Sequence, residues 1–202
     1  MENQLPLSKE EARRLVEIPC LTRGEEISGA FNYIKVKYGQ DGLKKVEENL
    51  KELGQPISFS ELRLTAWYPE GLNVLVILAG QQAFGWTEKD IFEIGRDIVK
   101  VSFIAKILVK YVVSAKQTFE LSSQQWHKFV SCGKLEPFVY NEEQRYAIWR
   151  LKGYKFHPLI CPFLGGYFLG LAQNIVRSDK ITIEETACMF KGAAYHEYTL
   201  RW

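Results

Sequence analysis

Several features that would assign this chain of 202 residues to a familiar class are missing from it. The net charge is only +2, so there is no basic excess of the kind that favours nucleic-acid binding. There is no Cys-x-x-Cys pair, which excludes a ribbon-type metal site based on cysteine spacing alone. No nucleotide-binding fingerprint and no triad spacing is recognisable. The small net charge argues against nucleic acid as a partner. The missing motifs mean that no sequence pattern supports an enzymatic role.

Long hydrophobic runs are also absent. The apolar stretch 72–84 is too short to span a bilayer, and lysines interrupt the stretch 97–113. The N-terminal segment MENQLPLSKEEARRL is polar and charged, unlike a secretory signal. We therefore expect a cytoplasmic protein with no membrane span, in which the four cysteines are mostly reduced.

What the chain does contain is apolar and aromatic. Apolar residues make up 47%, charged residues 25% and aromatic residues 13% of the sequence. The length and the balance suit one globular domain over 1–202, with a helical N-terminal region at 1–54. The many aromatic residues predict a large core, an aromatic-lined pocket, or both.

Helical patterns dominate the first two-thirds of the chain. Ser8 and Glu11 form a capping-box pattern at the start of the first helix, and Gly39 and Gly54 end the next two. Residues 55–71 contain turns. The expected helices are 8–18, 23–39, 40–54, 72–84, 87–95, 97–115 and 122–133.

The pattern then changes to strands. Residues 134–153 predict two strands around a polar turn, 157–176 predict a helix with Pro162 in its first turn, and 180–202 predict a hairpin around Lys191–Gly192. The order is helices followed by ββαββ. The sequence thus predicts an α+β fold in which helices pack on a small antiparallel sheet.

Strand alternation points two polar side chains of the last hairpin inward. His196 shares a face with Tyr198 and Leu200, and Glu185 shares a face with Ile183. An inward carboxylate needs a partner, which a metal ion or His196 itself would supply. Strict alternation turns Cys188 outward, so it joins them only if a bulge re-aims it.

Cys161, just before Pro162, lies at the expected start of a helix and adds a second sulfur. Two Cys, one His and one Glu make a plausible tetrahedral metal-binding set. Three alternatives stay open: the two Cys are small buried hydrophobes, they form a disulfide, or His196 and Glu185 form a metal-free ion pair. We expect His127 on a helix surface and His157 in a loop.

The segment CPFLGGYFLGLAQNIVRSDKITIEETACMFKGAAYHEYTLRW (161–202) resembles the C-terminal half of a 4-vinyl reductase domain, and 133–202 is the family-like core. The resemblance to the zinc-containing, phenol- and xylene-sensing domains of this family implies a structural zinc bound by Cys161, Glu185, Cys188 and His196. The chain departs from the family in having His196 where those sensors have Cys. Tyr140 falls near an aromatic residue that contacts phenol in them.

The same architecture relates this family to TRAPP subunits and to haem-nitric-oxide-binding domains. A haem version is disfavoured, since 97–115 has no His and no Tyr-x-Ser-x-Arg motif occurs.

Aromatic residues on the sheet and the helices are the candidate ligand-binding residues. They are Tyr140, Trp149, Trp126 and Phe156, although all four could be core. We interpret the chain as a sensory domain that binds a small apolar or aromatic molecule and acts on a partner, or on a second copy in a homodimer. The alternatives are a metal-dependent, reductase-like enzyme and a scaffold for a lipid or a partner helix.

Overall fold

The computed structural model describes residues 7–101, 114–176, 178 and 180–202. The chain divides into an N-terminal unit, Met1–Thr87, and a C-terminal unit, Glu88–Trp202. Six α-helices and two antiparallel sheets lie within the described residues, which confirms the α+β class. That the two units act as one domain stays a prediction.

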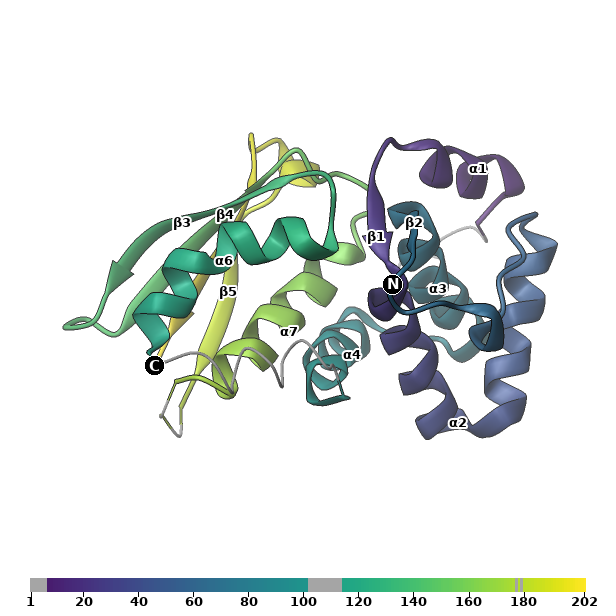
Figure 1. Ribbon diagram of the computed structural model, residues 1–202, viewed down its shortest axis with the longest axis horizontal. Helices are drawn as coiled ribbons and strands as arrows, with labels where there is room; N and C mark the ends of the chain where they lie inside the picture. The colour runs from purple at the N-terminus through teal and green to yellow at the C-terminus, as the bar shows by residue number, and fades with distance from the viewer. Residues whose placement is uncertain (1–6, 102–113, 177, 179) are drawn as a thin grey trace. The chain divides into compact units, whose positions relative to one another are not determined.

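The N-terminal unit is mainly helical (Figure 1). The capping box at Ser8 and Glu11 is present at the start of its first helix. Its elements are α1 (Lys9–Glu17), β1 (Leu21–Arg23), α2 (Gly24–Glu52), the 3-10 turn η1 (Phe59–Glu61), β2 (Trp67–Pro69) and α3 (Glu70–Phe84).

The C-terminal unit holds the four-stranded sheet, with strand order β3-β4-β6-β5 and every neighbouring pair antiparallel. Its elements are α4 (Glu88–Val101), α6 (Ala115–Phe129), β3 (Lys134–Asn141), β4 (Tyr146–Lys152), α7 (Ile160–Gln173), β5 (Thr182–Ala187), the 3-10 turn η2 (Met189–Lys191) and β6 (His196–Arg201). The predicted ββαββ order is confirmed. Most of the helix expected at 97–115 lies outside the described residues.

Helices α6 and α7 cover one face of this sheet (Figure 1). Phe119 of α6 and Phe168 of α7 both contact Trp149 of β4, while Phe168 also contacts Tyr198 of β6. Trp149 and Tyr198 are cross-strand partners, so their side chains share a face. The core of the C-terminal unit therefore lies between the sheet and the two helices.

Helix α4 packs on the far side of α7 through glycines. A side chain on Gly166 would meet the backbone carbonyl of Phe92, and one on Gly95 would meet that of Phe163. This lets the two backbones approach closely. The position of α7, which carries Cys161, thus depends on residues without side chains.

Two expectations need correction. The short β1–β2 pair was missed, because three-residue strands show no clear alternation. Thr199, which strand alternation places on the face of β6 opposite His196 and so toward solvent, is buried. The break expected between the helices 23–39 and 40–54 is confirmed, because the backbone of α2 is non-helical at Gly39 (φ 70°, ψ −166°). No helix within the described ranges is long and apolar enough to cross a membrane.

Candidate functional site

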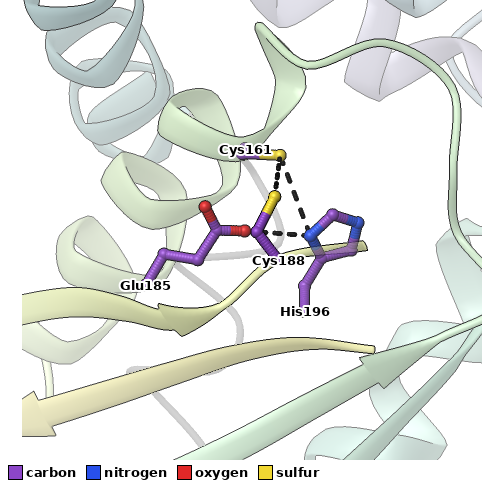
Figure 2. A group of neighbouring side chains, drawn as sticks. All are labelled: Cys161, Glu185, Cys188 and His196. Atoms are coloured by element: carbon purple, nitrogen blue, oxygen red, sulfur yellow. Dashed lines mark hydrogen bonds and ion pairs between the residues drawn. The ribbon is translucent and has the colours of Figure 1, made fainter. Parts of the chain in front are cut away.

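Four polar side chains meet between the first turn of α7 and the β5–β6 hairpin (Figure 2). We call Cys161, Glu185, Cys188 and His196 the CECH cluster. Their potential ligand atoms all lie within 4.8 Å of one another. Cys161 Sγ lies 3.6 Å from Cys188 Sγ and 3.7 Å from His196 Nδ1, which lies 2.9 Å from Glu185 Oε1. The structure brings together all four residues that the sequence singled out, and the ligation of a metal by them stays a prediction.

A bulge in β5 brings Cys188 into the cluster. Glu185 pairs with Tyr198 and Ala187 pairs with Glu197, so β5 advances two residues while β6 moves back by one. The extra residue reverses the alternation, which puts Cys188 on the same face as Glu185. The Cys188 carbonyl then accepts the amides of Lys191 and Ala193 and fixes the turn.

His196 has a partner at each ring nitrogen. Nε2 lies 3.1 Å from the backbone carbonyl of Tyr154, and Nδ1 faces Glu185. A carbonyl oxygen only accepts, so Nε2 must carry a proton. Nδ1 therefore has two possible states: protonated and paired with the Glu185 carboxylate, or unprotonated with its lone pair directed into the cluster. The second state is the one that binds metal ions.

Burial and negative charge make the cluster a poor place for further anions. Burial, then the nearby Glu185 carboxylate and then Cys188, raise the pKa of the Cys161 thiol. Burial and the Glu185 carboxylate likewise raise the pKa of Tyr198, whose hydroxyl donates to the Cys161 carbonyl at 3.2 Å. A cation among these groups would reverse both effects.

Two of the candidate ligand-binding residues lie in one aromatic group over the sheet. Tyr140 contacts Phe119 (5.5 Å between ring centroids) and Trp202 (5.6 Å), and Trp149 contacts Phe119 (5.0 Å). The Trp149 indole N–H donates to Ser122 Oγ at 3.2 Å. The Tyr140 hydroxyl has no hydrogen-bond partner among the described residues. Tyr140, Trp149 and Trp202 are all only partly buried.

The other two candidates lie in a second group. Trp126 and Phe156 both contact Tyr154, at 5.5 and 4.9 Å between ring centroids, and both are buried. The Trp126 indole N–H donates to the Cys132 carbonyl at 2.8 Å. In the part of the chain that the structure describes, no ring contact joins this group to the first one. The four residues thus form two groups and not one pocket wall.

Two contributors were missed by sequence reasoning. The Tyr154 carbonyl is a backbone group, so its residue type carries no signal. Tyr198 was placed with the inward apolar set, but its hydrogen bond to Cys161 spans 37 residues and no local pattern reports it.

Comparisons with known proteins identify the fold. No protein-family model matches the chain, and no curated protein matches it. Three solved structures of H-NOX proteins share its fold. The Fe(II)NO form of an H-NOX protein from S. oneidensis has a TM-score of 0.66 and 12% identity, and the match covers 89% of this chain and 98% of that chain. A structure that probes the function of heme distortion in the H-NOX family has a TM-score of 0.61 and 13% identity, and the match covers 89% of this chain and 94% of that chain. The Fe(II) unliganded H-NOX protein from K. algicida has a TM-score of 0.61 and 8% identity, and the match covers 89% of this chain and 95% of that chain.

These identities show the fold alone. The expected relation to haem-nitric-oxide-binding folds is confirmed at that level, while membership of the 4-vinyl reductase family stays a prediction. The expected zinc cofactor is contradicted, because these H-NOX structures hold heme or Fe(II) and not zinc.

The residues of this chain do not fit a histidine-ligated haem. The chain has three histidines, and all of them are described. His196 is buried, but its Nε2 is held by the Tyr154 carbonyl and its Nδ1 is directed into the CECH cluster. His127 is exposed on α6, and half-buried His157 accepts the Leu159 amide at Nδ1. A proximal histidine needs a ring nitrogen that faces the haem iron, and none of the three offers a buried one outside the CECH cluster.

Proposed function

We propose that the C-terminal unit is a sensory domain that binds a small apolar or aromatic molecule at the aromatic group around Tyr140 and Trp149. The single observation that carries the proposal is the partly exposed Tyr140, which lies beside other rings and whose hydroxyl has no hydrogen-bond partner among the described residues. Rings supply apolar contact, and one free hydroxyl fixes the orientation of a polar substituent. The likeness of the fold to H-NOX proteins supports a ligand-binding role.

The aromatic group is connected to the CECH cluster by packing. Trp149 stacks on Phe168 (6.3 Å, interplanar angle 7°), and Phe168 contacts Tyr198 (5.2 Å). Tyr198 donates to the Cys161 carbonyl at the start of α7. A ligand that moves Trp149 would therefore act on α7 and the last hairpin, and this change is what a partner or a second copy of the chain would read.

We further propose that the CECH cluster binds a metal ion that fixes the β5–β6 hairpin to α7. In a tetrahedral site with bonds of about 2.0–2.3 Å, ligand atoms lie about 3.3–3.8 Å apart. The two sulfur distances, 3.6 and 3.7 Å, fall in this range. The Tyr154 carbonyl would hold Nε2–H and leave Nδ1 for the ion. Four protein ligands leave no open position, so the ion would be structural and not catalytic.

Calorimetric titration with phenol and with toluene tests the ligand proposal. We expect both to bind, and we expect Tyr140→Phe to weaken phenol about fivefold to tenfold while leaving toluene unchanged, because only phenol uses the hydroxyl. Trp149→Leu should weaken both ligands, and Trp126→Leu neither. Equal affinity of the wild-type protein and Tyr140→Phe for phenol would contradict the proposal. Native mass spectra of the same samples show whether the chain is a dimer.

Elemental analysis tests the metal proposal. We expect about one transition-metal ion per wild-type chain and less than about a tenth of that in Cys188→Ser. An equal metal content in both proteins would contradict the proposal. Lys191→Ala, in the same turn, serves as the control that should keep the metal.

A further inference from the structure

The two sulfurs of the CECH cluster are neighbours held by different elements. Cys161 lies in the first turn of α7 and Cys188 follows β5, 27 residues later. Both are free thiols with 6% of their surface exposed. Figure 2 shows the Cys188 sulfur directed at that of Cys161, and the distance between them is 3.6 Å.

We propose that Cys161 and Cys188 are a redox modification site, which a peroxide converts to a disulfide and a thiol reductant restores. Disulfide formation would remove two of the four donors of the cluster, so oxidation would expel the bound ion. The part about the ion rests on the proposed function. The disulfide itself does not.

The reaction balances with hydrogen peroxide as the oxidant. The sulfur of one thiol attacks a peroxide oxygen as it gives up its proton, the O–O bond breaks, the leaving hydroxide takes up that proton as water, and a sulfenic acid forms. The sulfur of the second thiol attacks that of the sulfenic acid as it gives up its own proton, the S–S bond forms, the S–O bond breaks, and the leaving hydroxide takes up the proton as a second water. The two thiols together lose two electrons and two protons, and the peroxide becomes two molecules of water.

The geometry favours this second step over further oxidation. The partner sulfur is already at 3.6 Å, whereas a second peroxide must enter a buried site. An S–S bond of about 2.05 Å requires the sulfurs to approach by about 1.5 Å. Cys188 precedes the short turn η2 and not a long helix, so the turn can shift as a unit to supply the approach, with its two hydrogen bonds to the Cys188 carbonyl intact.

Peptide mapping of the wild-type protein tests the proposal. Samples with the metal present and samples stripped by a chelator are treated with hydrogen peroxide, blocked with an alkylating agent and cut with trypsin. Cys161 falls in the peptide 156–177 and Cys188 in the peptide 181–191. We expect these two peptides to appear linked and to separate with dithiothreitol. Cys20 and Cys132 fall in other peptides, 15–23 and 129–134, so the bond is assigned without ambiguity.

A chromogenic chelator measures metal release in the same reaction. We expect ion and disulfide to appear in equal amounts and at equal rates. Glu185→Gln, which loses a metal ligand but keeps both thiols, should still form the linked peptide, and Cys161→Ser should not.

Recovery of the two peptides unlinked, either alkylated or as sulfinic acids, would overturn the proposal. A linked peptide from a protein that never contained metal would uphold the disulfide and contradict the metal site.

Discussion

Each of the two units buries a set of polar side chains. The two sets differ in how many of their polar atoms have a hydrogen-bond partner. In the CECH cluster both ring nitrogens of His196 have partners and both sulfurs have polar neighbours. In the N-terminal unit, Asn73 Nδ2 donates to Glu70 Oε1 at 3.1 Å. However, buried Asn73 Oδ1 and Thr22 Oγ1 have no hydrogen-bond partner among the described residues.

This difference follows from the chemistry of the side chains. The CECH cluster mixes a group that donates or accepts with acceptors and thiols, so it can satisfy itself or bind a cation. The N-terminal group is rich in acceptors, and burial, then Glu70 and then Glu25, raise the pKa of nearby Glu26 to about 8. If the proposals above hold, the CECH cluster responds to a metal ion and to oxidant, whereas the N-terminal group responds to protons.

The largest effect is expected from His196→Ala, measured by urea unfolding with a chelator present. Removing the ring leaves Glu185 and the Tyr154 carbonyl without their partner, and we expect a loss of about 3–4 kcal/mol. Asn73→Ala should cost at most about 1 kcal/mol, because its oxygen already lacks a donor. His127→Ala on the surface is the control. Similar losses for His196→Ala and Asn73→Ala would break the comparison.

The next effect concerns the position of α7. Gly166→Ala forces a methyl group against the Phe92 carbonyl, and we expect a loss of about 2–3 kcal/mol in thermal or urea unfolding. Gly165→Ala is the matched control, because its nearest neighbours are ring carbons of Phe92 at 3.3 Å or more, which can shift. Equal stability of the two variants would show that α7 does not depend on the glycine contact.

Glu26→Gln tests whether Glu26 makes the stability of the N-terminal unit depend on pH. The raised pKa means that the folded state binds more protons than the unfolded state between pH 4.5 and about 8, so stability falls as pH rises through this window. Glu26→Gln should remove the fall and stabilise the protein by about 1–2 kcal/mol at pH 8, the side chain being half-buried. Exposed Glu48→Gln should not. Parallel pH profiles for the wild type and Glu26→Gln would refute this expectation.

Tyr198→Phe should have a smaller effect, about 1 kcal/mol, since it removes the hydrogen bond to the Cys161 carbonyl. Tyr140→Phe, whose hydroxyl has no partner among the described residues, should change stability by less than about 0.5 kcal/mol. Guanidinium unfolding of the two variants measures how much each hydroxyl contributes to the free energy of unfolding. If Tyr140→Phe costs as much as Tyr198→Phe, the Tyr140 hydroxyl is already in use.

Much of the fold could be predicted because its signals are local. Ser8 and Glu11 marked α1, and Pro162 lies in the first turn of α7, as expected. Gly192 (φ 92°) lies in the predicted turn of the last hairpin. The pairing of β1 with β2 could not be predicted, since it joins three-residue strands more than forty residues apart.

The candidate site was predicted in part for the same reason. Alternation alone placed Glu185 and His196 inward, and the structure gives both partly or fully buried positions. The position of Cys188 depends on a bulge, which has no clear sequence signal, and the partner of His196 Nε2 is a backbone carbonyl 42 residues away. The aromatic candidates separate into two groups because tertiary packing, and not residue type, decides which rings meet.

The strand order has a kinetic consequence for this site. β5 pairs with β6 and has no second strand neighbour in the four-stranded sheet, and it carries Glu185 and leads to Cys188. A strand held along one side can detach while the other three remain paired. Detachment of β5 would expose Glu185 and Cys188 together. Its frequency would then limit how fast an ion or a peroxide molecule enters, whatever the equilibrium affinity.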